Sequence, residues 1–97
     1  MGKASRVRNK KLVLGKVAIQ ERIWAVPQAV PGCAHGYKYS LALIVDGECI
    51  LRYDNERGKG DHRHFMDQES AYAFVSLEIL MDDFQAEVQR ILQEVKS

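Results

Sequence analysis

The sequence predicts an α+β protein, with a small antiparallel sheet of four to five strands packed against one long C-terminal helix. Three observations carry this prediction. Aromatic and aliphatic residues occupy every second position from Tyr37 to Val45, and this stretch ends at Asp46-Gly47, a dipeptide typical of tight hairpins. Residues 49–53 follow that turn and are expected to return antiparallel to the first stretch. The last twenty or so residues repeat their apolar positions at helical spacing instead.

The chain has 97 residues and a net charge of +1, which is room for one domain. We expect a disordered basic arm over 1–9 and a single α+β domain over 10–97. The first sixteen residues contain no acid, and their basic residues are Lys3, Arg6, Arg8, Lys10, Lys11 and Lys16. Such an arm suits contact with phosphate, and a solvated, frayed terminus explains it equally well.

Composition excludes several classes of protein. No apolar run approaches the ~20 residues of a membrane-spanning helix, and no apolar stretch follows the basic N-terminus as in a secretory signal. Cys33 and Cys49 form neither a disulfide scaffold nor a paired zinc motif. We therefore expect a cytoplasmic protein with no membrane contact, no bound metal and no cofactor.

The first third of the chain is expected to contain two strands and a loop. Alternation over 12–19 predicts a strand that bends near Gly15. A second short strand over 23–26 stops at Pro27, which cannot donate to a sheet ladder. Prolines and glycines then mark 27–36 as a loop.

The hairpin around Asp46-Gly47 is the centre of the predicted fold. With a two-residue turn, Val45 is expected to face Glu48, and Leu43 to face Ile50. Continuing this register, Leu41 lies near Arg52 and Tyr39 near Asp54.

The C-terminal segment is expected to begin with a short strand over 71–75. A helix starting at Asp67 would be roughly 43 Å long, too long for a domain of this size. Ser76 is a suitable N-cap, with Glu78 in the first turn, so the helix is predicted to run from Leu77 to about Val95. Its apolar stripe consists of Leu77, Leu80, Met81, Phe84, Val88, Ile91, Leu92 and Val95.

Residues 52–64 concentrate the chemistry of this chain at the junction of a strand and a glycine-broken loop. Loops on a rigid scaffold often carry function, and histidine exchanges protons near neutral pH. The candidate catalytic residues are His62, His64, Arg52 and Asp54, and the candidate substrate-binding residues are Arg63, Lys59, Tyr53 and Asn55.

Three interpretations of His62-Arg63-His64 compete. In an extended segment both imidazoles project to one face and Arg63 to the other, so the pair suits a metal with Asp54 or Asp61. Alternatively, one histidine takes a proton from a ribose 2′-hydroxyl while another group protonates the leaving oxygen, and the cations stabilise the phosphorane. In the third interpretation, both histidines are solvated or structural.

The motif order resembles the TumE-like toxins of prokaryotic type II toxin–antitoxin modules. The resemblance covers roughly 37–92 and rests mainly on Arg52-Tyr53-Asp54-Asn55 and Asp61-His62-Arg63-His64. It implies a small antiparallel α+β protein, encoded beside a helix-turn-helix antitoxin that holds it inactive. It also implies that Arg52, Asp54, His62 and His64 are the functional positions.

The sequence thus supports a toxin that acts as a metal-independent ribonuclease through this His/Arg patch. The alternative is a noncatalytic module that binds RNA or a protein partner through the same basic surface. A third interpretation is a homodimeric scaffold that uses the C-terminal helix.

Overall fold

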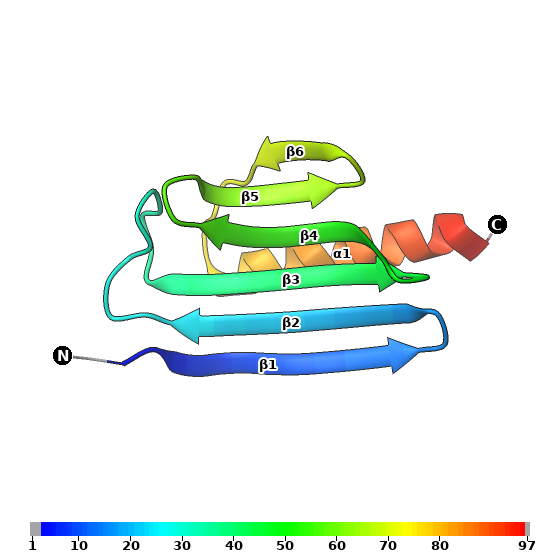
Figure 1. Cartoon of the computed structure of the whole chain (residues 1–97), viewed down its shortest axis with the longest axis horizontal. Coiled ribbons are helices and arrows are strands. Elements are labelled where there is room, and N and C mark those ends of the chain that lie inside the picture. Colours follow the sequence, from blue (N-terminus) through cyan, green and yellow to red (C-terminus); the bar gives the residue numbers. More distant parts are fainter. Residues whose placement is uncertain (1–2, 97) are drawn as a thin grey trace.

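The computed structural model describes residues 3–96, which form six strands and one helix. All six strands belong to one antiparallel sheet and follow one another in chain order (Figure 1). The elements are β1 (Ser5–Leu14), β2 (Val17–Ala25), β3 (Tyr37–Val45), β4 (Glu48–Glu56), β5 (Gly60–Phe65), β6 (Gln68–Ala71) and α1 (Leu77–Lys96). The predicted α+β class is confirmed, with six strands rather than four to five.

The N-terminal segment is more ordered than its composition suggests. Ser5 to Asn9 belong to β1 and pair with β2, so the expected disordered arm over 1–9 is wrong for these residues. Residues 1–2 lie outside the described part of the chain. The strand expected over 12–19 is two strands, because Gly15 at φ 59° reverses the chain instead of bending it. Residues 23–25 are the end of β2 rather than a strand of their own, and Val26 follows that strand.

The central hairpin forms at Asp46-Gly47, where both residues have positive φ, as in a type I′ turn. Val45 pairs with Glu48 as predicted, but the register then shifts by one residue. Ile50 is the extra residue of a β-bulge, so Leu43 faces Leu51 instead of Ile50. Arg52 consequently pairs with Ala42, and Asp54 with Ser40, rather than with Leu41 and Tyr39.

The segment after β5 also differs from expectation. The strand predicted over 71–75 is wrong: β6 ends at Ala71, and 72–76 connect the sheet to the helix. The chain leaves the sheet here because it must cross to the face where α1 lies. The Tyr72 amide still donates to the Asp61 carbonyl at 3.0 Å, and its hydroxyl donates to Asp83 in α1 at 2.6 Å.

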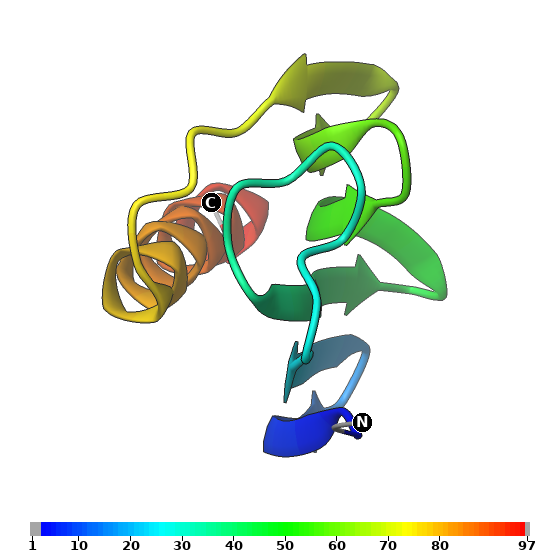
Figure 2. The same ribbon diagram turned by 90° about the vertical axis from the view of Figure 1, so that its left-hand side faces the viewer.

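Helix α1 begins where the sequence predicts. The Ser76 hydroxyl accepts a hydrogen bond from the Ile79 amide at 3.1 Å, which is the geometry of an N-cap. The helix covers one face of the sheet (Figure 2) and packs its predicted stripe from Leu77 to Leu92 against that face. The side chain of Val95, the last predicted residue of the stripe, lies outside the described part of the chain. The buried helix residues are Leu80, Phe84, Val88 and Ile91. No helix among residues 3–96 is long and apolar enough to cross a membrane.

Cross-strand pairing divides the sheet into two chemically distinct faces, because side chains alternate along each strand. The face under α1 carries rows such as Leu43, Leu51 and Phe65. The opposite face, called the open face below, carries two polar rows. One row consists of Asn9, Arg22, Ser40, Asp54 and His62, and the other of Lys11, Gln20, Ala42, Arg52, His64 and Glu69.

Truncating the centre of the stripe should be costly. Phe84 has no exposed surface, so we expect Phe84→Ala to lower the free energy of unfolding by about 3–5 kcal/mol. Ile79 is 41% exposed on the same helix, and Ile79→Ala should cost less than about 1 kcal/mol. Urea denaturation followed by circular dichroism measures both. Equal losses for the two variants would contradict this packing.

Candidate functional site

The structure brings the four candidate catalytic residues together on the open face. Arg52 and Asp54 are alternate residues of β4, and they pair across the ladder with His64 and His62 of β5. The Arg52 Nε lies 3.0 Å from Asp54 Oδ2, and the His64 Nε2 lies 3.6 Å from Asp54 Oδ1. The two imidazole centroids are 6.1 Å apart. We call these four residues the histidine patch.

Glu69 of β6 completes the surroundings of the histidine patch. Its carboxylate oxygens lie 3.3 Å from His62 Nδ1 and 3.8 Å from His64 Nδ1. Within the described part of the chain, neither His62 Nε2 nor His64 Nε2 makes a hydrogen bond, and both atoms are shielded from solvent. The two imidazoles thus share the Glu69 carboxylate on their Nδ1 sides, and neither Nε2 makes a hydrogen bond to a described residue, although that of His64 faces the Asp54 carboxylate.

Basic side chains extend the open face away from the patch, across β1 to β3. Register places them on the same side as the histidines, and they are exposed: Arg6, Lys11, Arg22 and Lys38. Trp24 lies in the row of Arg6 and Lys38, with the Arg6 guanidinium 5.8 Å from its ring centroid. An open face with cations and one exposed aromatic ring can contact a phosphate backbone and stack a base.

Three of the four candidate substrate-binding residues lie away from this face. Arg63 projects under α1, where its Nε donates to Glu87 at 2.6 Å, and the Tyr53 hydroxyl donates to the same carboxylate. Asn55 is fully buried, and its amide bonds the backbone of Tyr37 and Tyr39 in β3. The contacts of these three residues join elements of the fold to one another.

Lys59, the fourth, is exposed in the turn between β4 and β5. Its ammonium lies 3.9 Å from the Glu56 carboxylate. The turn lies beyond the end of the histidine rows, so Lys59 does not join the patch directly.

The ion pair of Arg63 and Glu87 links the sheet to the helix. Burial alone would raise the pKa of Glu87, but hydrogen bonds from Arg63 and Tyr53 and the nearby positive charges outweigh it. The net result is a pKa below the usual 4.5. Folding therefore favours the ionised carboxylate, which contributes stability above that pH.

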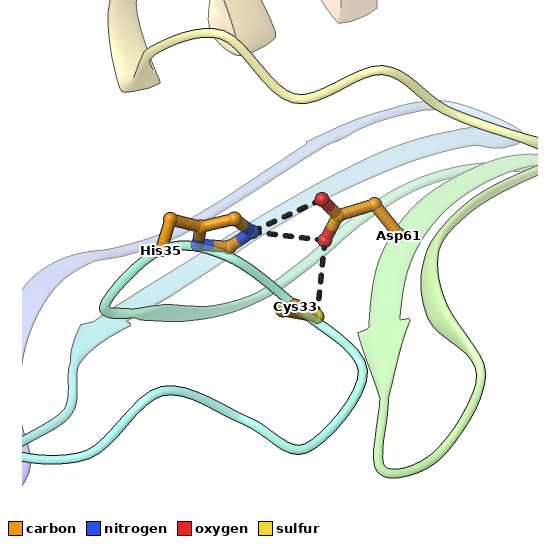
Figure 3. Close-up of side chains that lie close together, drawn as sticks. All are labelled: Cys33, His35 and Asp61. Carbon is orange, nitrogen blue, oxygen red and sulfur yellow. Dashed lines mark hydrogen bonds and ion pairs between the residues drawn. The ribbon is translucent and has the colours of Figure 1, made fainter.

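A second cluster, which the sequence reasoning did not assemble, lies where the loop between β2 and β3 meets β5. It consists of Cys33, His35 and Asp61 (Figure 3), and we call it the loop cluster. His35 Nε2 lies 2.9 and 3.1 Å from the two carboxylate oxygens of Asp61, and the Cys33 thiol donates to Asp61 Oδ1 at 3.3 Å. Asp61 and His62 are adjacent in a strand, so their side chains project to opposite faces. The signal in the sequence was Cys33-x-His35 in a loop, but nothing local indicated Asp61 as its partner.

Burial and the hydrogen bond to Asp61 raise the pKa of the Cys33 thiol above 9.0. The thiolate is the reactive form of cysteine, and a raised pKa keeps this side chain protonated. A nucleophilic role for Cys33 is therefore not supported by its surroundings.

Close backbone contact holds the loop against the turn between β4 and β5. The Gly58 amide donates to the Pro31 carbonyl at 2.7 Å. Gly32 and Gly60 both have positive φ, and a Cβ on Gly60 would lie 2.9 Å from the Gly32 carbonyl oxygen. The contact thus depends on the absence of a side chain at both positions.

A family model described as "Toxin TumE" matches residues 3–92, nearly the whole chain. The match reaches further toward the N-terminus than the motifs of the sequence analysis, and it includes β1 and β2. No curated protein and no solved structure matches the chain.

The Glu87 carboxylate should make stability sensitive to acid. Its pKa is lowered in the folded state, so its contribution is present above about pH 4.5 and is lost as pH falls through the folded pKa. We expect the free energy of unfolding to fall less steeply below pH 5 in Glu87→Gln than in the wild type. Urea denaturation from about pH 3 to pH 7 measures this. Parallel pH profiles for the two proteins would contradict a lowered pKa at Glu87.

The contact between the two glycines should show up as a stability difference between neighbouring positions. Gly58 and Gly60 have φ of 82° and 79°, but a Cβ on Gly58 has no atom within 4 Å. Gly58→Ala therefore introduces only the strain of a positive φ, whereas Gly60→Ala also introduces a steric clash between its Cβ and the Gly32 carbonyl oxygen. We expect Gly60→Ala to be about 1–3 kcal/mol less stable than Gly58→Ala. Thermal unfolding measures both, and equal stabilities would contradict the close approach.

Proposed function

The chain belongs to the TumE family of toxins, and we propose that it is the toxin of a prokaryotic type II toxin–antitoxin pair that cleaves RNA on the open face of its sheet. The observation that carries the catalytic part is the convergence of Arg52, Asp54, His62 and His64 on that face. Figure 1 views this face, with α1 behind the sheet. The convergence depends on two neighbouring strands and the register between them.

The proposed reaction needs a base, an acid and a cation near one phosphodiester. One imidazole acts as the base and takes the proton of a ribose 2′-hydroxyl as the hydroxyl oxygen attacks phosphorus. Another group acts as the acid and protonates the departing 5′-oxygen. The imidazole pair, 6.1 Å apart between centroids, supplies both roles. Arg52 stabilises the charge that develops on the phosphoryl oxygens, while Asp54 and Glu69 orient the two rings. None of these steps requires a metal ion.

Access to the histidine patch involves a local adjustment. The side chains of His62 and His64 are 13% and 24% exposed, and their Nε2 atoms lie below the surface. The side chains of Arg52 and Glu69 are more exposed, at 39% and 45%. We infer that the side chains of Arg52 and Glu69 change conformation when the phosphodiester reaches the two histidines.

The remaining open face supports binding of the rest of the RNA. The exposed cations of β1 to β3 would follow the phosphate backbone, and Trp24 offers a ring, 36% exposed, for one base. Such binding weakens as salt rises, because each neutralised phosphate releases counterions.

A toxin of this family implies an antitoxin partner, and we propose that the partner is a helix-turn-helix protein that acts with it in the cytoplasm. A homodimer through α1 has less support. The buried residues of its stripe pack against β3 and β4 of the same chain.

The second candidate function is a module that binds RNA or protein through this face without cleaving it. The observation that favours it is the two carboxylates beside the histidines, which can hold imidazoles in a purely structural network. In both functions the exposed cations of β1 to β3 bind the partner molecule. Only in the first function do His62 and His64 take part in cleavage.

Histidine substitutions should separate cleavage from binding. We expect His62→Ala and His64→Ala to lower the cleavage rate of a labelled RNA by about 10²–10⁴-fold, with little change in affinity. Both variants should also relieve growth inhibition when the chain is expressed without an antitoxin. Cleavage is measured with purified protein on RNA and on a 2′-deoxy oligonucleotide of the same sequence. The deoxy strand should bind and remain intact, because it lacks the attacking hydroxyl.

Charge substitutions provide the matched control. Arg22→Ala and Lys11→Ala remove exposed cations from the open face without touching the histidine patch, so they should weaken binding and lower the salt dependence by about 0.7 per charge. Their cleavage rate at saturating RNA should stay near that of the wild type. Absence of cleavage by wild-type protein, with RNA affinity that follows the removed charge alone, would support the noncatalytic module instead.

A further inference from the structure

The loop cluster has the ligand chemistry of a transition-metal site. Among residues 3–96 it is the one group of three Cys, His or acidic residues whose donor atoms all lie within 4.8 Å of one another. A sulfur, an imidazole nitrogen and a carboxylate oxygen form a set that Zn²⁺ accepts in tetrahedral coordination. Harder cations such as Mg²⁺ and Ca²⁺ prefer oxygen ligands alone.

The charge balance of the loop cluster favours a cation. The His35 and Asp61 side chains are each 10% exposed. The Tyr37 amide donates to His35 Nδ1 at 3.2 Å, so Nε2 is the nitrogen that donates to Asp61. Asp61 therefore places a nearly buried carboxylate against two hydrogen-bond donors, His35 and Cys33, and burial together with this carboxylate raises the pKa of the nearby Tyr39 hydroxyl. A buried carboxylate is costly without a compensating positive charge, and a divalent ion would supply one.

The donors are also held in place by their surroundings. The His35 ring stacks on Phe74 at 3.7 Å between centroids and 23° between planes. The Asn55 amide donates to Cys33 Sγ at 3.6 Å, as outer-shell groups do for metal-bound thiolates. The Cys33 amide donates to the Val30 carbonyl at 2.8 Å, which fixes the loop around the thiol.

We propose that Cys33, His35 and Asp61 bind one Zn²⁺ ion, which joins the loop between β2 and β3 to strand β5. On binding, the Cys33 thiol releases its proton to solvent and its sulfur bonds the metal. The ring proton of His35 moves from Nε2 to Nδ1, so that Nε2 bonds the metal and the Tyr37 amide turns from Nδ1. One Asp61 oxygen is the third ligand. The three protein ligands leave one tetrahedral position open to solvent. The ion lies on the other side of β5 from His62 and takes no part in the proposed RNA chemistry.

The test uses the full chain, freed of metal and titrated with Co²⁺ and then Zn²⁺. We expect one equivalent of Co²⁺ to give a near-ultraviolet cobalt–thiolate charge-transfer band, which Zn²⁺ then abolishes. X-ray absorption of the zinc form should show one sulfur at about 2.3 Å among nitrogen and oxygen neighbours. Saturating zinc should raise the Tm by more than about 5 °C.

Matched variants locate the site. Cys49 is the other cysteine and is exposed in β4, so Cys49→Ser should keep the thiolate band, whereas Cys33→Ser should lose it. His35→Gln and Asp61→Asn should weaken binding by at least about a hundredfold. His62→Ala with His64→Ala should leave binding unchanged, which separates this site from the histidine patch. If a variant fails to fold, the spectra of the wild-type protein still show whether a thiolate binds the metal. Absence of a thiolate band in the wild type, or its loss in Cys49→Ser, would overturn the proposal.

Discussion

One extra residue in β4 determines which side chains of this strand lie under the helix and which lie on the open face. Side chains alternate between the faces of a strand, so a shift of one position exchanges every residue that follows. The bulge at Ile50 introduces such a shift between the Asp46-Gly47 turn and Arg52. With a regular ladder, Arg52 would face Leu41 in the core and Tyr53 would face solvent. With the bulge, Tyr53 reaches Glu87 beneath the helix, and Arg52 and Asp54 stand on the open face beside the histidines.

The two faces then perform different physical tasks. Under α1, apolar burial and the ion pair of Arg63 with Glu87 join the helix to the sheet. The one helix among residues 3–96 lies on the other face, so the cations and imidazoles of the polar rows remain at or near the surface. Adjacent residues of β5 therefore have unrelated roles: His62 and His64 belong to the histidine patch, Arg63 to the packing of the helix, and Asp61 to the loop cluster.

Local patterns in the sequence predicted the parts of this structure that local physics determines. The Ser76 cap, the helical stripe, the Asp46-Gly47 turn and the opposition of Arg63 to His62 and His64 all follow from neighbouring residues. The bulge could not be predicted in this way, because Ile50 has no side-chain feature that distinguishes a bulged from a paired position. The loop cluster was missed because Cys33 and Asp61 are 28 positions apart and are joined only by the docking of a loop. The strand β1 was mistaken for a frayed arm because its charge resembles that of a terminus, although it pairs with β2 along its length apart from a bulge between Arg6 and Arg8.

Strand β1 is also the outer edge of the sheet, and this position has a consequence for the behaviour of the chain in solution. One side of the strand pairs with β2, and the other is not paired with any described strand, while Val13 and Leu14 are 59% and 63% exposed. Long, apolar, unpaired edges invite a second copy to add on and begin aggregation. Here the same edge bears the basic residues that first suggested an unstructured tail, and two such edges repel each other. The positive charge of β1 thus opposes self-association through this edge. Concentrated salt screens the charge and therefore weakens this opposition.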